Sequence, residues 1–296
     1  MQTAATKPGE ASIGTPETRA LHESFLAYGQ FRYMKMAGLL AVASIVIYAL
    51  DRPYGTGYGG SWAGYTLGTI GALLIAWLTW FGYSKRRYSA IRGRLAARLS
   101  AHVYLGLSLL FVATLHTGFH FGVNIHTLAY ALMCLVIGTG IFGAFSYDRY
   151  PRLITENRSG MTMQQMLGRV ASLDDELRHV AMPLDEDTAA IIQHVIDTTV
   201  IGGSVMSQLR GRVANCTSTA ALAHVDAKAA DIAPEMQEAW LRLRVLLDEK
   251  VLLLVRLRRD ISYKAVMDLW LYFHVPLSFM LLAALIAHIV SVFFLW

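Results

Sequence analysis

Cysteine is scarce in this chain. The sequence contains only Cys134 and Cys216, and no Cys-x-x-Cys motif. Four-cysteine iron–sulfur clusters, zinc ribbons and haem attached covalently through Cys-x-x-Cys-His are therefore excluded within the chain. Because Cys134 lies in a hydrophobic segment and Cys216 in a polar one, we expect no disulfide between them.

Charged residues are also few. They make up 16% of the 296 residues, whereas 55% are hydrophobic. Soluble domains carry about a quarter charged residues, so this composition favours a membrane protein in contact with lipid. The net charge is only +5, and the basic residues lie mostly beside hydrophobic segments. That pattern is typical of topology signals and does not indicate nucleic-acid binding.

Hydrophobic runs predict an all-α integral membrane fold with five membrane-spanning helices. We expect these helices at about 33–50, 62–83, 99–122, 127–147 and 266–296. Residues 1–30 are rich in small and polar residues and are expected to form a flexible N-terminal segment. The expected organisation is helices one to four within 31–147 and helix five within 265–296.

Between the fourth and fifth helices, residues 148–264 are polar, with charges throughout. Helical periodicity is present over 162–177, 186–200 and 235–259, and Asp185 and Pro234 are expected helix-start residues. We interpret this stretch as a soluble helical insertion. Its detailed fold does not follow from the sequence.

The distribution of Lys and Arg predicts the orientation in the membrane. Arg52 alone lies in the first link, and residues 121–125 carry no charge. Six basic residues lie between helices two and three, namely Lys85, Arg86, Arg87, Arg92, Arg94 and Arg98. We therefore expect the N-terminus and the insertion in the cytoplasm and the C-terminus outside, as in a bacterial-type inner membrane. Helices three and five then run parallel.

Four histidines lie inside the predicted membrane helices at a repeated spacing. His102 and His116 on helix three, and His274 and His288 on helix five, both follow a His-x13-His pattern. An offset of fourteen residues returns to nearly the same helix face about 21 Å further along. His102 is thus level with His274 near the cytoplasm, and His116 with His288 near the outer face. Histidine is costly inside a membrane, and two facing pairs fit the axial ligation of two haems.

Two further histidines flank the outer pair. His120 follows His116 by one helical turn on the same face and is an alternative outer ligand, although the matched spacing favours His116. His120 and His126 are then expected at the outer membrane surface. Two interpretations remain open for them: proton acceptors at a quinone site, or interfacial residues that contact water or a propionate.

Near the inner pair, two residues on helix three are candidate haem contacts. Arg98 lies one turn before His102 and could pair with a haem propionate, or could serve only as a positive-inside residue. Gly106 lies one turn after His102 and would let a flat macrocycle approach the backbone.

Together, these motifs resemble the dihaem membrane cytochromes b. This superfamily includes cytochrome b of quinol:cytochrome c oxidoreductases and bacterial b561-type electron-transfer subunits. The residues that carry the resemblance are Ala101-His-Val-Tyr-Leu-Gly, Leu115-His-Thr-Gly-Phe-His and His274-x13-His288. The resemblance implies two non-covalent haem b groups in a four-helix core and electron transfer usually coupled to quinone. The chain departs from the respiratory pattern in its long insertion and in lacking a Pro-Glu-Trp-Tyr motif.

The leading hypothesis is a membrane subunit that transfers electrons between quinone or quinol and a partner redox protein. The partner would be a flavin, iron–sulfur or cytochrome c protein, because the chain has no nucleotide fingerprint or cysteine set of its own. One alternative is a histidine-dependent proton or metal transporter, or a signalling protein, without haem. Another is a ferric reductase of the b561 type.

Overall fold

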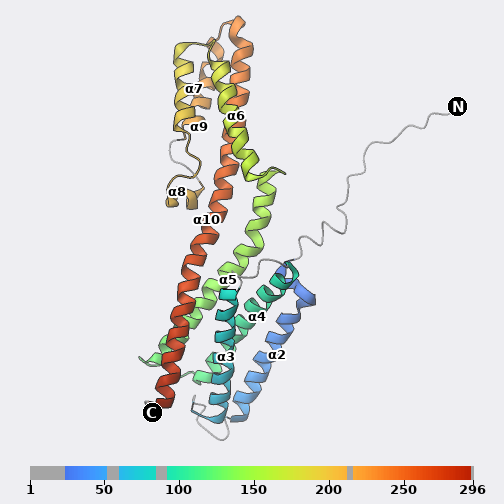
Figure 1. The fold of residues 1–296 in the computed structure, drawn as a ribbon, viewed down its shortest axis with the longest axis vertical. Helices are drawn as coiled ribbons and strands as arrows, with labels where there is room; N and C mark the ends of the chain where they lie inside the picture. The colour runs from blue at the N-terminus through green and yellow to red at the C-terminus, as the bar shows by residue number, and fades with distance from the viewer. Residues whose placement is uncertain (1–23, 52–59, 85–91, 212–215, 295–296) are drawn as a thin grey trace, which may run out of the picture. The chain divides into compact units, whose positions relative to one another are not determined.

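The computed structural model describes residues 24–51, 60–84, 92–211 and 216–294, and every regular element in these ranges is a helix. Figure 1 shows them in chain order: η1 (Phe25–Ala27), α2 (Tyr28–Asp51), α3 (Trp62–Ser84), α4 (Arg92–Thr117), α5 (Ile125–Arg158), α6 (Met163–Ala181), α7 (Glu186–Thr198), α8 (Val205–Arg210), α9 (Thr217–Lys228), η2 (Ala229–Asp231), η3 (Pro234–Met236) and α10 (Gln237–Phe294). Helices α2, α3, α4, α5 and α10 contain segments long and apolar enough to cross a membrane. The chain is therefore an all-α, multi-pass membrane protein.

Two compact units make up the chain. Unit 1 comprises Met1–Ala144 and Phe273–Trp296, and unit 2 comprises Phe145–Tyr272. Helices α5 and α10 contribute residues to both units. The sequence predicted that the fourth membrane helix ends near residue 147 and that the fifth begins near 266. Instead, α5 continues to Arg158 and α10 begins at Gln237. A change from apolar to polar side chains does not by itself interrupt the backbone hydrogen bonds of a helix.

In unit 1, α4 packs along both α2 and α3 (Figure 1). The first membrane helix, predicted at 33–50, is the part of α2 that follows a left-handed bend at residues 29–31. One buried apolar cluster joins α3, α4, α5 and α10 through Ile75, Leu78, Leu109, Met133 and Leu281. These four helices surround the cavity described below, and α4, α5 and α10 carry the histidines discussed there.

Unit 2 is a helical assembly with its own apolar core. Helix α7 packs against both α6 and α9, and the first half of α10 contributes residues to the same core. Asp185 is the N-cap of α7, as the sequence predicted, and Pro234 begins η3 directly before α10. The core also contains a charged pair, because the fully buried Lys250 contacts Asp174 at 2.5 Å without hydrogen-bond geometry.

Candidate functional site

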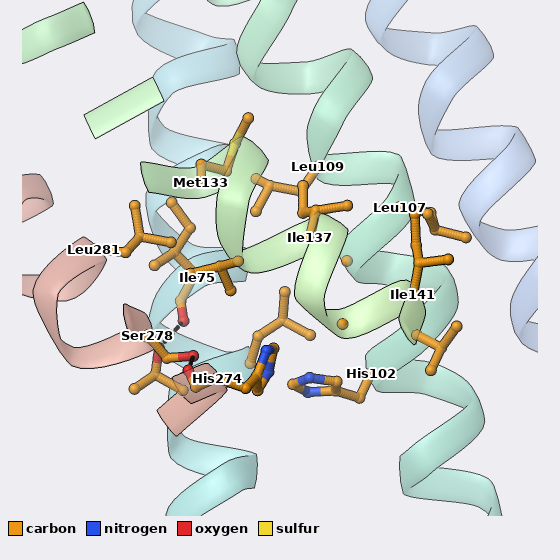
Figure 2. Close-up of a pocket in the computed structure, with 16 residues that line it drawn as sticks. Ile75, His102, Leu107, Leu109, Met133, Ile137, Ile141, His274, Ser278 and Leu281 are labelled. Atoms are coloured by element: carbon orange, nitrogen blue, oxygen red, sulfur yellow. Dashed lines mark hydrogen bonds between the residues drawn. The ribbon is translucent and has the colours of Figure 1, made fainter. Parts of the chain in front are cut away.

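A cavity lies between α3, α4, α5 and α10 in unit 1. Its volume is about 80 Å³, and sixteen residues line it. Figure 2 shows the rings of His102 from α4 and His274 from α10 pointing toward each other at one end. The equal histidine spacing predicted this pairing. The cavity therefore has two facing imidazoles supplied by two different helices.

The rest of the cavity wall is mainly aliphatic. It includes Ile75, Leu78, Val103, Leu107, Leu109, Met133, Val136, Ile137, Ile141 and Leu281. Gly106 also lies in the wall, and nothing is found within 4 Å of the place where a Cβ atom would stand. At Gly140, a Cβ would come only into ordinary contact with the His274 ring, at 3.5 Å. Apart from the two imidazoles, the polar side chains in the wall are Thr79 and Ser278.

Thr139 on α5 fixes the protonation of the His274 ring. The Thr139 hydroxyl donates its hydrogen to the carbonyl of Val136 at 2.9 Å, and the same oxygen lies 2.9 Å from His274 Nδ1. A hydroxyl has one hydrogen to donate, so in the neutral ring Nδ1–H donates to Thr139. The lone pair of His274 is then on Nε2, the tautomer that binds a metal through Nε2.

The second pair lies further along the same two helices. The ring centres of His116 on α4 and His288 on α10 are 6.0 Å apart, and the ring planes are at 90°. A metal ion bound by two imidazole nitrogens at about 2 Å each would separate the ring centres by roughly 6 Å. At this separation His116 and His288 would be able to hold one metal ion between them.

His116 is oriented by the backbone of α3. Its Nδ1 lies 2.7 Å from the carbonyl oxygen of Gly64. A carbonyl only accepts, so Nδ1–H is the donor and the lone pair of the neutral ring is on Nε2. Gly68 makes this approach possible, because a Cβ there would lie 2.7 Å from His116 Cε1. The ring thus occupies the space that a side chain at Gly68 would fill.

His288 has a partner that the sequence analysis did not foresee. Its Nδ1 is hydrogen-bonded to Nδ1 of His126, in the first turn of α5, and the two ring centres are 4.5 Å apart. The sequence placed His126 at the outer membrane surface, in the short link before the fourth helix. In the structure, its ring lies against His288.

The prediction for His120 was wrong in one respect. It placed His120 on the same helical face as His116, but α4 ends at Thr117, and Gly118 and Phe119 have φ angles of 55° and 62°. His120 therefore lies in the link after the helix, where its exposed side chain contacts the Gly118 carbonyl at 2.8 Å. Only His116 of the two lies against His288.

Arg98, which the sequence suggested as a haem contact together with Gly106, has an exposed side chain on α4. It is not among the residues that line the cavity. Residues found only in the structure are Thr139 and Gly64, which hold the histidine rings, and Phe81, whose ring centre is 5.3 Å from that of His102. A polar threonine inside an apolar helix was a usable signal. The carbonyl of Gly64 carries no sequence signal at all.

The donors at these two sites are pairs of histidines, which is the number of ligands that a haem would take from the protein. Within the described ranges, no three or more His, Cys, Asp or Glu side chains converge in a way that could hold a metal ion. Haem needs only two ligands from the protein, because its macrocycle supplies the other four. Two opposed histidines and an apolar wall match that requirement.

Comparison with known proteins adds no relative: no family model, no curated protein and no solved structure matches the chain.

Proposed function

We propose that this protein is a membrane dihaem b-type cytochrome that transfers electrons across the bilayer between quinone or quinol and a partner redox protein. One observation carries the proposal: two histidine pairs on α4 and α10 face each other at two levels of one helical bundle. In this reading His102 and His274 hold one haem b, and His116 and His288 hold the other.

In this proposal the protein positions the histidine ligands. Thr139 and the Gly64 carbonyl keep the lone pairs of His274 and His116 on Nε2, where an axial ligand needs them. Aliphatic side chains line most of the cavity, and Gly106 leaves space beside His102. Haem supplies the one-electron chemistry when bound. The helical rise puts the two levels about 21 Å apart, so together they span much of an apolar layer about 30 Å thick.

The charge distribution supports an orientation with unit 2 and the N-terminus in the cytoplasm and the C-terminus outside. Unit 2 would then offer a surface for a flavin or iron–sulfur partner, while a cytochrome c protein would meet the outer face. Quinone is the membrane-soluble donor or acceptor in this scheme.

Haem stoichiometry after detergent purification tests the proposal. We expect the reduced-minus-oxidised absorbance spectrum of the wild type to show two low-spin b haems per chain. His274→Ala and His288→Ala should each retain one haem, and the two variants should lose different spectral components. His120→Ala is the matched control, since it removes a histidine from the link after α4, and it should retain both haems.

Absence of haem from folded wild-type protein would overturn the proposal and favour a histidine-dependent transporter or signalling protein. Transfer across the membrane needs a second assay, in liposomes that enclose ferricyanide while quinol is supplied outside. Haem-dependent reduction of the enclosed ferricyanide is expected. Reduction of externally added ferric chelates, without any transfer to the quinone pool, would instead indicate a ferric reductase.

A further inference from the structure

The hydrogen bond between His126 and His288 joins α5 to α10 beside the outer histidine pair, His116 and His288. His126 lies on α5 and His288 on α10, and their Nδ1 atoms are the bonded atoms. The two ring centres are 4.5 Å apart and the ring planes are at 89°. This bond occupies the one ring nitrogen of His288 that an axial ligand bound through Nε2 does not use.

The direction of this bond follows from the protons available. One Nδ1 atom must donate and the other must accept. If His288 binds metal through Nε2, its own proton is on Nδ1, so His288 is the donor. His126 is then the acceptor at Nδ1 and carries its proton on Nε2. The opposite arrangement would place the His288 proton on Nε2 and would prevent ligation.

We propose that His126 is a positioning residue for the outer haem, acting through the axial ligand His288. This inference rests on the proposed function. By accepting the Nδ1–H bond, His126 selects the binding tautomer of His288, fixes the rotation of its ring and increases the electron density on Nε2. His126 itself does not touch the iron.

Two measurable consequences follow. A more electron-rich ligand stabilises ferric over ferrous iron, so His126 lowers the midpoint potential of the haem between His116 and His288. Loss of an outer-shell partner changes metal affinity by about tenfold or more. If loss of the partner weakens mainly the binding of the ferric state, a tenfold lower affinity raises the midpoint potential by about 59 mV for one electron. The ferric electron paramagnetic resonance signal would depend on the angle between the axial ring planes. The planes of His116 and His288 are at 90°, and the bond from His126 would restrain the rotation of the His288 ring.

The test compares His126→Leu, which removes the acceptor, with His126→Asn, whose amide oxygen can stand near the position of Nδ1. Redox titration with optical detection follows both haems in one sample, and His288→Ala and His274→Ala identify which component belongs to which site. We expect His126→Leu to keep both haems, to raise only the outer midpoint and to shift only the outer paramagnetic signal. His126→Asn should return both readouts most of the way to wild type.

Thr139→Val is the matched control, because Thr139 accepts from Nδ1 of His274 in the other pair. It should raise the inner midpoint and leave the outer one unchanged, which also shows that each chain is folded. Unchanged outer midpoint and signal in His126→Leu would overturn the role of His126 while leaving the dihaem proposal intact. Loss of the outer haem in both His126 variants would make His126 a ligand and would equally overturn the inference. A wild type without haem would defeat both proposals together.

Discussion

Gly68→Ala offers a test of the outer histidine pair that leaves every histidine in place. The added Cβ would lie 2.7 Å from Cε1 of His116, whereas ordinary van der Waals contact begins at 3.4 Å. The ring or α3 must therefore move by about 0.7 Å, more than the roughly 0.5 Å that a preorganised site tolerates. The movement also strains the bond from His116 Nδ1–H to the Gly64 carbonyl.

The expected cost can be estimated from overpacking. Such contacts cost about 1–3 kcal/mol, which corresponds to roughly 5- to 150-fold weaker binding if the strain is relieved when the haem leaves. Alanine also favours the helix over glycine by about 0.5–1 kcal/mol, but that gain is present with or without haem. We therefore expect Gly68→Ala to release the outer haem faster to excess apomyoglobin, while the inner haem is retained as in wild type.

Gly71→Ala is the control, one turn further along α3. Its Cβ would meet Leu109 and Val112 at 3.7 and 3.8 Å, which are ordinary contacts. It shares the helix-propensity gain and should release neither haem faster. Equal release rates for Gly68→Ala and wild type would refute the argument that Gly68 makes room for the His116 ring.

Three further predictions concern unit 2. Burial raises the pKa of the Cys216 thiol, but hydrogen bonds from Arg258 and Thr219 outweigh this effect and lower the pKa to about 7. In a Cys134→Ser background, alkylation of Cys216 by iodoacetamide should therefore reach half its maximal rate near pH 7. Arg258→Met should move that midpoint toward higher pH. Asp174→Ala leaves the buried Lys250 charge without its partner and should lower the free energy of unfolding by about 3–5 kcal/mol. The double variant Asp174→Ala with Lys250→Met should regain most of this free energy. Thermal unfolding of the intact chain measures both. Hydrogen bonds from Lys228 and Thr188 lower the pKa of the Asp185 carboxyl to about 2. Its capping of α7, worth about 0.5–2 kcal/mol, should therefore be fully present above about pH 4 and lost as the pH falls toward 2. A stability difference between wild type and Asp185→Ala that stays constant down to pH 2 would contradict this.

The membrane helices and the pairing of the histidines were predictable because both depend on periodic features of the chain. Apolar runs located the five spans, and the repeated fourteen-residue interval placed His102 opposite His274 and His116 opposite His288. These signals are carried by side chains on the same helix. The levels of the pairs also depended on the Lys and Arg distribution, which makes helices three and five parallel.

The ring partners could not be derived in the same way. Gly64 acts through its carbonyl oxygen, which every residue possesses, and His126 reaches His288 across 162 positions of sequence. The error at His120 has a local cause: α4 ends at Thr117, and Phe119 adopts a left-handed conformation that is uncommon for residues other than glycine. Hydrophobicity continued past the point where the helix stops.

The cavity described in unit 1 has a consequence for biosynthesis. Three of its four walls, α3, α4 and α5, are made early, but the fourth belongs to the end of α10. At about 5–20 residues per second, the ribosome reaches His274 roughly 10–30 seconds after His102. During that interval the polar residues of unit 2 are synthesised, while His102 and His116 still lack their partners His274 and His288. The cavity therefore closes only after α10 has been synthesised and has packed against α3, α4 and α5.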